Sequence, residues 1–206
     1  MPAKEELLQI VEQKQVRFID LQFTDVVGAV KSVTIPANQL PDALDHGVWF
    51  DGSSIEGFAR IAESDMYLVP DVETFAVLPW LEGKDTTARL ICNVYTPNGQ
   101  PFIGDPRAVL ARVLDDAEKM GFVFDTGPEL EFFLLKPNPD GSIIPPVPQD
   151  TTGYFDQPTD LAGGLRREMT AALEAFGIVV EAMHAEVANG QHEIDFRYSN
   201  ALTTAD

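Results

Sequence analysis

The sequence is poor in cysteine, in histidine and in positive charge. Cys92 is the only cysteine among 206 residues, so no disulfide can form within the chain and a reducing compartment is expected. Lysine and arginine number 14 against 33 aspartates and glutamates, which gives a formal net charge of −19. Such a chain repels phosphates, so neither nucleic acid nor an anionic membrane is expected as a partner.

Long apolar runs are also missing. No stretch approaches the roughly 20 apolar residues that cross a bilayer, and the charged N-terminus lacks the apolar core of a signal peptide. We therefore expect a soluble, cytoplasmic protein. Hydrophobic residues make up 45% of the chain, which is enough for a packed core. The apolar residues around Cys92 predict a buried strand with an unreactive thiol.

The first half of the chain is rich in predicted strands. Residues 16–23 and 29–35 are rich in strand-forming residues and are joined through Asp25-Val26-Val27-Gly28, which predicts a hairpin. Further strands are expected at 66–69, 74–78 and 89–95, with short helices near residues 7–11 and 38–46. The turn residues Pro97, Asn98 and Gly99 then suggest that a first domain spans residues 1–99.

A second domain is expected over residues 100–206. Asp105 followed by Pro106 predicts a helix start, and this helix should run to about Met120. Strands are expected at 122–125 and 129–135, a proline-rich loop at 136–150, and a helix at 160–176. A hairpin is expected over 178–188 and 191–198, turned by Asn189-Gly190. The predicted class is α+β, with a second domain that the chain does not complete.

The predicted hairpin brings carboxylates together. A two-residue turn at Asn189-Gly190 places Glu186 opposite Glu193, and His184 opposite Asp195. Directly opposed side chains on antiparallel strands lie about 4.5–5.5 Å apart at Cβ. Two glutamates at that distance repel each other unless one is protonated or a cation lies between them.

A second carboxylate pair comes from the strand at 129–135. Glu129 and Glu131 share one face because side chains alternate along a strand, and the otherwise apolar residues of this strand predict that the opposite face is buried. Taken alone, the pair Glu129 and Glu131 is better explained as an ordinary solvated strand face, whereas Glu186 opposite Glu193 fits a solvated face and a cation site equally well. Two such pairs in one domain indicate divalent cations with oxygen ligands, Mg²⁺ or Mn²⁺. Two metals suit phosphoryl transfer or hydrolysis, so the pattern predicts a metal-dependent enzyme.

Several segments resemble the glutamine synthetase family. The resemblance rests on residues 181–196 (EAMHAEVANGQHEIDF), 128–134 (PELEFFL) and 50–58 (FDGSSIEGF), with shorter matches at 64–66, 70–71 and 153–155. The hairpin spacing is similar to that of bacterial and archaeal class I members. The resemblance implies a small β-grasp-like N-terminal domain followed by the start of an α+β catalytic domain. It also implies ATP-dependent formation of glutamine from glutamate and ammonium through γ-glutamyl phosphate, in a homo-oligomer, a dodecamer of two hexameric rings.

The resemblance assigns roles to five glutamates. Glu131, Glu186 and Glu193 match the ligands of one divalent metal, and Glu129 matches a ligand of a second, so two Mg²⁺ or Mn²⁺ ions are implied per active site. Glu181 matches a glutamate of the nucleotide site. Glu181 precedes Glu186 by an odd offset, so a regular strand would point the two side chains to opposite faces. A bulge or a strand end near residue 183 would resolve this conflict.

Further roles concern the ammonium site. Asp51 and Ser54 match a loop that in the family enters the neighbouring subunit's active site, where Asp51 would bind ammonium and remove its proton. Tyr154 would line the same pocket. Without the resemblance, this Asp-Gly-Ser-Ser segment is an ordinary turn. Arg60 resembles an arginine linked to glutamine feedback in one subgroup, or is a solvent-facing arginine. His192 is expected on the face opposite the glutamates, in a structural role.

Family members run roughly twice the length of this chain, which domain sizes alone would not indicate. We therefore expect a chain that ends inside the catalytic domain, is inactive alone and exposes apolar surface. Two other functions stay open. One is a ligase of the same family that joins glutamate to an amine, which Asp51 and Ser54 disfavour. The other is a non-catalytic structural or regulatory relative, which the retention of all four metal-site glutamates disfavours.

Overall fold

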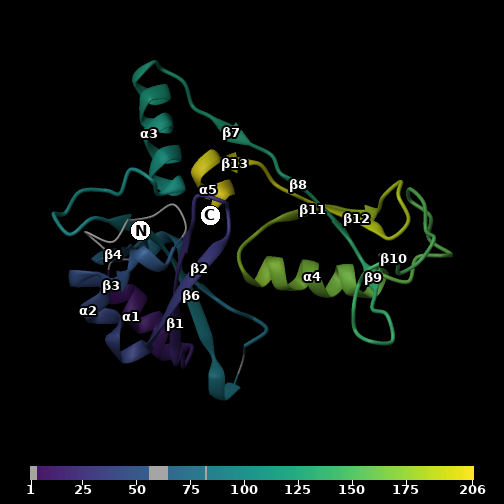
Figure 1. The fold of residues 1–206 in the computed structure, drawn as a ribbon, viewed down its shortest axis with the longest axis horizontal. Helices are drawn as coiled ribbons and strands as arrows, with labels where there is room; N and C mark the ends of the chain where they lie inside the picture. Colours follow the sequence, from purple (N-terminus) through teal and green to yellow (C-terminus); the bar gives the residue numbers. More distant parts are fainter. Residues whose placement is uncertain (1–3, 56–64, 82) are drawn as a thin grey trace. The chain divides into compact units, whose positions relative to one another are not determined.

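The computed structural model describes residues 4–55, 65–81 and 83–206. They divide into two compact units, Met1–Phe124 with Ala205–Asp206 and Asp125–Thr204. Figure 1 shows the elements of both units coloured along the sequence. Arg60 lies outside the described residues, so both of its interpretations stay open.

One mixed sheet forms the centre of the first unit. Its strands are β1 (Phe18–Thr24), β2 (Val30–Pro36), β3 (Val48–Asp51), β4 (Asp65–Pro70), β5 (Ala76–Val77) and β6 (Thr87–Tyr95). The order is β2-β1-β6-β4-β3, with β5 also pairing with β6. The β1–β6 pair is parallel and the other pairs are antiparallel. The predicted hairpin is confirmed as β1–β2, whereas β3 was not predicted.

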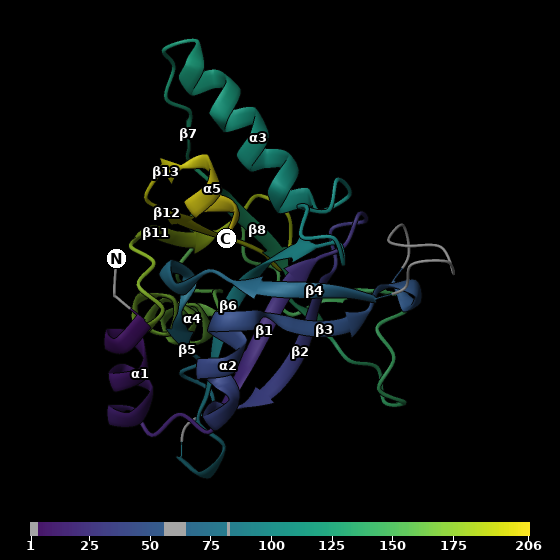
Figure 2. The same ribbon diagram turned by 90° about the vertical axis from the view of Figure 1, so that its left-hand side faces the viewer.

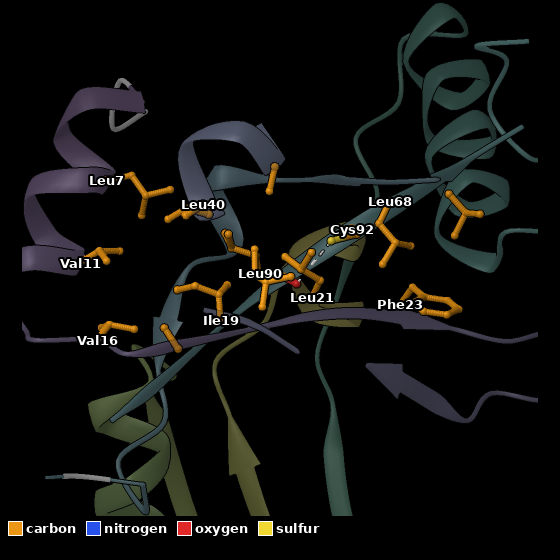
Figure 3. Packing of buried hydrophobic residues seen from close by; sticks show 14 of the residues in the cluster. Leu7, Val11, Val16, Ile19, Leu21, Phe23, Leu40, Leu68, Leu90 and Cys92 are labelled. Atoms are coloured by element: carbon orange, nitrogen blue, oxygen red, sulfur yellow. Dashed lines mark hydrogen bonds between the residues drawn. The ribbon is translucent and has the colours of Figure 1, made fainter. Parts of the chain in front are cut away.

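Two helices cover one face of this sheet (Figure 2), α1 (Lys4–Gln13) and α2 (Leu40–His46). Figure 3 shows Leu7 of α1 and Leu40 of α2 pointing toward Ile19 and Leu90 of the sheet, and all four side chains are fully buried. Cys92 belongs to the same core, and burial raises the pKa of its thiol. The predicted inert cysteine is therefore confirmed. Single-turn 3₁₀ helices lie at Ala37–Gln39, Gly52–Ser54, Val72–Thr74 and Gly83–Asp85.

Helix α3 (Pro106–Lys119) begins where the sequence predicts. The Asp105 carboxylate caps it by accepting from the Arg107 backbone N–H at 3.0 Å, and its other oxygen accepts from Val94 N–H of β6 at 3.0 Å. The predicted stop at Met120 is confirmed as the helix C-cap. Because α3 contacts β6, it belongs to the first unit. The predicted domain boundary near residue 100 stays a prediction.

A three-stranded antiparallel sheet organises the second unit. Strands β11 (Val180–Ala185), β12 (Gln191–Phe196) and β8 (Glu129–Phe133) run in the order β11-β12-β8. Helix α4 (Gly163–Ala175) packs on β11, as Figure 1 shows. Short pairs join β9 (Leu135–Lys136) to β10 (Val147–Pro148) and β7 (Asp125–Thr126) to β13 (Ser199–Asn200), and α5 (Ala201–Ala205) follows.

Two predictions for this region are wrong. The strand predicted at 122–125 is reduced to β7, and the exposed residues Phe122 to Phe124 find no strand partner among the described residues. The opposite face of β8 is not buried, since Leu130 is 48% exposed; β8 is an edge strand, and α4 contacts β11 at the other edge.

The helix predicted over about 160–176 is confirmed as α4, with Phe176 as its C-cap. It begins at Gly163 rather than at residue 160, and the Asp160 side chain ahead of it accepts a hydrogen bond from Ala162 N–H.

Within the described part of the chain, no helix has both the length and the apolar character that a membrane span requires.

Candidate metal and active site

The β11–β12 hairpin closes in a different register from the predicted one. His184 lies opposite Glu193, and Ala185 lies opposite His192. Glu186 N–H donates to Gln191 C=O at 2.9 Å, so the connection has four residues, 187–190, rather than two. Gly190 explains the difference, since its C=O accepts from Leu134 N–H at 2.8 Å, beyond the end of β8. A Cβ on Gly190, which has φ +74°, would meet Leu134 O at 2.9 Å, so only glycine permits this approach.

The change of register is two residues, so each side chain keeps its face. Strand β12 pairs Glu193 with Glu131 and Asp195 with Glu129 on β8. Glu186 follows β11, and its Oε1 lies 3.5 Å from His184 Nδ1 on the same face. The predicted convergence of Glu129, Glu131, Glu186 and Glu193 on one side of a sheet is therefore confirmed, and Asp195 joins them.

His184, on the edge strand β11, lies at one end of this carboxylate face, next to Glu193 of the central strand β12. Its Nδ1 lies 3.5 Å from Glu186 Oε1, and its Nε2 lies 3.9 Å from Glu193 Oε2 and 4.0 Å from Asp195 Oδ2. The rings of Tyr154 and Phe155 meet the imidazole edge-on, at centroid distances of 5.5 and 5.0 Å. Sequence reasoning assigned no role to His184, although its two-residue spacing from Glu186 places both on one face.

The neighbouring carboxylates disfavour the ionised form of Glu193, which is 8% exposed. Hydrogen bonding with Asp195, then burial, then the neighbouring Glu186 raise the pKa of Glu193 to about 7. Asp195 Oδ1 is buried and has no hydrogen-bond partner within the described residues. A divalent cation would satisfy that oxygen and relieve the repulsion. One ligand atom each from His184, Glu193 and Asp195 lie within 4.8 Å of one another, so these residues fit a metal.

Gln191 is a second residue that the sequence did not single out. Its Nε2 donates to Glu131 Oε2 at 2.5 Å, across the β12–β8 pair. The contact fixes one oxygen of Glu131 and leaves the other carboxylate oxygen free to bind a ligand. Gln191 therefore orients Glu131 at the end of the carboxylate row.

His192 lies on the opposite face of the sheet and has a structural role there, as the sequence predicted. The ring is fully buried, and its Nδ1 lies 2.9 Å from Arg166 Nη1 of α4. Arg166 also pairs with Asp160 in front of the helix. Burial, and then the positive charge of Arg166, lower the pKa of His192, so its imidazole is neutral.

A β-bulge resolves the odd spacing of Glu181. Val180 pairs with Phe196 and Ala182 pairs with Asp195, so Glu181 is the extra residue on β11. The predicted bulge therefore lies at Glu181 itself, close to the predicted position. Glu181 Oε1 lies 3.6 Å from Arg197 Nε, and Arg197 comes two residues after Asp195. The inserted residue thus allows Glu181 to share the face of Asp195.

Family models account for both parts of the chain. The model of the glutamine synthetase β-grasp domain matches residues 15–97, and that of the glutamine synthetase catalytic domain matches residues 103–206. The chain belongs to the glutamine synthetase family. The predicted fold, a β-grasp domain followed by an α+β catalytic domain, is confirmed.

Curated relatives agree with this membership. The glutamine synthetase of Clostridium saccharobutylicum is 52% identical over 205 residues, which are 99% of this chain and 46% of the relative. That of Staphylococcus aureus (strain Mu50 / ATCC 700699) is 51% identical over 206 residues, with coverages of 99% and 46%. The chain therefore spans just under half the length of these curated relatives.

Solved structures share the fold. The GmaS/ADP complex (conformation 1) superposes with a TM-score of 0.84 at 30% identity, covering 99% of this chain and 46% of the other. The cryoEM structure of Plasmodium falciparum glutamine synthetase gives a TM-score of 0.80 at 22% identity, with coverages of 99% and 46%. The second likeness is one of fold alone.

The three residues that the glutamine synthetase resemblance places at the ammonium site fall in different units. Asp51 ends β3, and Ser54 lies in the 3₁₀ turn that follows, both in the first unit. Ser53 donates to Asp51 Oδ1 from its hydroxyl at 2.6 Å and from its backbone N–H at 2.9 Å, and these bonds lower the pKa of Asp51. Tyr154 belongs to the second unit and contacts His184, beside the carboxylates.

Proposed function

We propose that this protein acts in the ATP-dependent ligation of ammonia to L-glutamate, which forms L-glutamine through γ-glutamyl phosphate. One observation carries the proposal, namely the row of glutamates on one face of a sheet, inside a segment that matches the glutamine synthetase catalytic domain. Because the chain spans about half the length of its curated relatives, the proposal concerns the part of the active site that these residues supply.

In this proposal the carboxylate face holds divalent cations. Glu131, Glu186 and Glu193 bind one Mg²⁺ or Mn²⁺, and Glu129 contributes to a second site. The bound cations would polarise the phosphoryl oxygens of ATP and neutralise charge that develops during transfer. Gln191 keeps Glu131 turned so that one oxygen stays free, which supports a preformed site.

The remaining residues bind the other substrates. Glu181 takes part in the nucleotide site. Asp51, kept ionised by the two Ser53 hydrogen bonds, attracts ammonium and accepts its proton, and Ser54 and Tyr154 line the same pocket. The protein forms a homo-oligomer, a dodecamer of two hexameric rings. In it, Asp51 enters the active site of a neighbouring subunit and acts beside that subunit's carboxylates. The expected cytoplasmic location belongs to the same proposal.

A chimaera tests the proposal. In it, this chain replaces the aligned segment of the Clostridium saccharobutylicum glutamine synthetase, to which it is 52% identical. We expect the chimaera to form glutamine from glutamate, ammonium and ATP with Mg²⁺. Glu131→Gln and Glu193→Gln should each reduce kcat by about 10²–10³-fold, because electrostatic stabilisation of the transition state is lost. Glu118→Gln, on the exposed side of α3, is the matched control and should retain the activity.

The outcomes separate the candidate functions. Activity with methylamine but not with ammonium would replace the proposal by the amine ligase. A folded, oligomeric chimaera that turns over neither substrate would favour a non-catalytic relative. Activity that survives Glu131→Gln and Glu193→Gln would contradict the assignment of the metal site.

A further inference from the structure

His184 brings a ring nitrogen to the carboxylate face within 4 Å of Glu193. Its Nε2 lies 3.9 Å from Glu193 Oε2 and 4.0 Å from Asp195 Oδ2, and its side chain is 18% exposed. These separations are too long for hydrogen bonds, so the imidazole is near both carboxylates without being engaged by them. Asp195 also retains a buried oxygen with no partner among the described residues. His184 Nε2 and Asp195 Oδ1 are therefore both available as ligand atoms.

An aromatic clamp keeps the imidazole there. The Tyr154 and Phe155 rings, 3.8 Å apart at their centroids, both contact His184 edge-on. Phe155 has φ +60°, in the left-handed region that a bulky residue enters only when its surroundings require it. Its N–H donates to Ala185 C=O at 3.4 Å, which ties the clamp to the end of β11. The left-handed backbone of Phe155 thus accompanies the contact between the Phe155 ring and His184.

A nitrogen donor changes which cation is favoured. Mg²⁺ prefers oxygen ligands and keeps several waters, so an imidazole adds little to its affinity. First-row transition ions accept imidazole, and Co²⁺ binds a given nitrogen site more tightly than Mn²⁺ does. We propose that His184 determines the cation specificity of this site, adding a nitrogen ligand to the oxygens of Glu193 and Asp195 so that first-row transition ions are preferred over Mg²⁺. The inference rests on the proposed function, in which Glu193 binds a divalent cation; Asp195 is a ligand that the inference adds.

The test compares three cations on the same chain. Loss of the free Mn²⁺ EPR signal measures Mn²⁺ affinity, visible absorption measures Co²⁺ affinity, and competition against Mn²⁺ measures Mg²⁺ affinity. His184→Asn should weaken Co²⁺ binding by about tenfold or more, Mn²⁺ binding by less, and Mg²⁺ binding by under about twofold. His46→Asn, at an exposed position of α2 paired with Asp42, is the matched control and should change none of the three.

A spectroscopic readout makes the test independent of stability. Electron spin-echo modulation from ¹⁴N should be present for Mn²⁺ bound to the parent and to His46→Asn, and absent from His184→Asn and from His184→Gln. Phe155→Leu, which removes one ring of the clamp, should reduce the Co²⁺ preference while keeping the nitrogen modulation. Equal losses for all three cations, or modulation that persists in both His184 variants, would overturn the inference while leaving the metal site standing. Absence of Mn²⁺ binding by the parent would overturn the proposed function as well.

Discussion

Glu193 of β12 lies directly opposite Glu131 of β8. On its other side, the same glutamate pairs with His184 of β11. A row of two carboxylates and one imidazole therefore crosses the whole sheet, with Gln191 orienting Glu131 at one end. Like charges placed opposite each other cost stability, so the row is explained best by a ligand that compensates them.

Metal binding should stabilise the fold. Millimolar Mg²⁺ or Mn²⁺ is expected to raise the Tm, because an ion that binds the folded state adds about 2.7 kcal/mol at 100 times its Kd. Glu186→Gln should lose most of this shift, whereas Glu118→Gln should keep it. Calorimetry with and without EDTA measures the effect. A parent Tm that does not respond to metal, matched by Glu186→Gln, would contradict a preformed site.

Without metal, stability should depend on pH through Glu193. The folded pKa is raised to about 7, above the ordinary glutamate pKa of about 4.3. The folded state therefore holds a proton that the unfolded state releases, so the free energy of unfolding should decrease as the pH rises from about 4.3 to about 7. Urea denaturation of the parent and of Glu193→Gln in EDTA checks this. The parent should show the steeper decrease; parallel curves would show that Glu193 does not carry the effect.

Asp105 joins α3 to the sheet through both carboxylate oxygens. Asp105→Ala removes the helix cap and leaves the buried Val94 N–H without its acceptor, so we expect a loss of about 2–4 kcal/mol. Asp116→Ala, on the exposed side of the same helix, should leave the free energy of unfolding nearly unchanged, because an exposed ion pair contributes little. Denaturant unfolding of both variants gives the comparison. Similar losses in the two would mean that the Val94 contact contributes little.

Arg107 forms ion pairs with Asp71 and Asp206, and all three residues belong to the first unit. Its Nη2 lies 2.7 Å from Asp206 Oδ2 and 2.7 Å from Asp71 Oδ2, and its Nε donates to Asp206 Oδ1 at 2.8 Å. Arg107→Met leaves both carboxylates uncompensated and should cost about 2–3 kcal/mol, less than for a fully buried pair because Asp71 keeps partial exposure. Denaturant unfolding measures this loss. Lys119→Met, which breaks an exposed pair, is the control and should leave the free energy of unfolding nearly unchanged.

Local patterns predicted much of this architecture. The strand-forming residues in 16–23 and 29–35 predicted the β1–β2 hairpin. Asp105 and Pro106 predicted the start of α3, because capping depends on neighbouring residues alone. The shared face of Glu129 and Glu131 followed from the period of a strand.

Predictions failed where distant contacts decided the outcome. A four-residue connection replaces the predicted two-residue turn at Asn189-Gly190. The reason is that Gly190 C=O accepts a hydrogen bond from the N–H of Leu134, which lies 56 positions earlier in the sequence. Leu130 was expected to be buried, yet β8 is an edge strand whose outer side has no neighbour among the described residues. No local pattern indicates the Gly190–Leu134 hydrogen bond or the edge position of β8.

The order of residues along the chain was enough to predict which side chains share a face and which chemistry they suit. Strand period places Glu129 with Glu131 and Glu186 with Glu193, and an error of two residues in register leaves each side chain on its face. Direct neighbours across the sheet were set by folding. The folded chain places His184 beside Glu193, brings Tyr154 and Phe155 from a distant loop against the imidazole, and buries Asp195 Oδ1 with no partner among the described residues. Periodicity acts between neighbouring residues, whereas register and aromatic contacts depend on segments that meet only after the chain has folded.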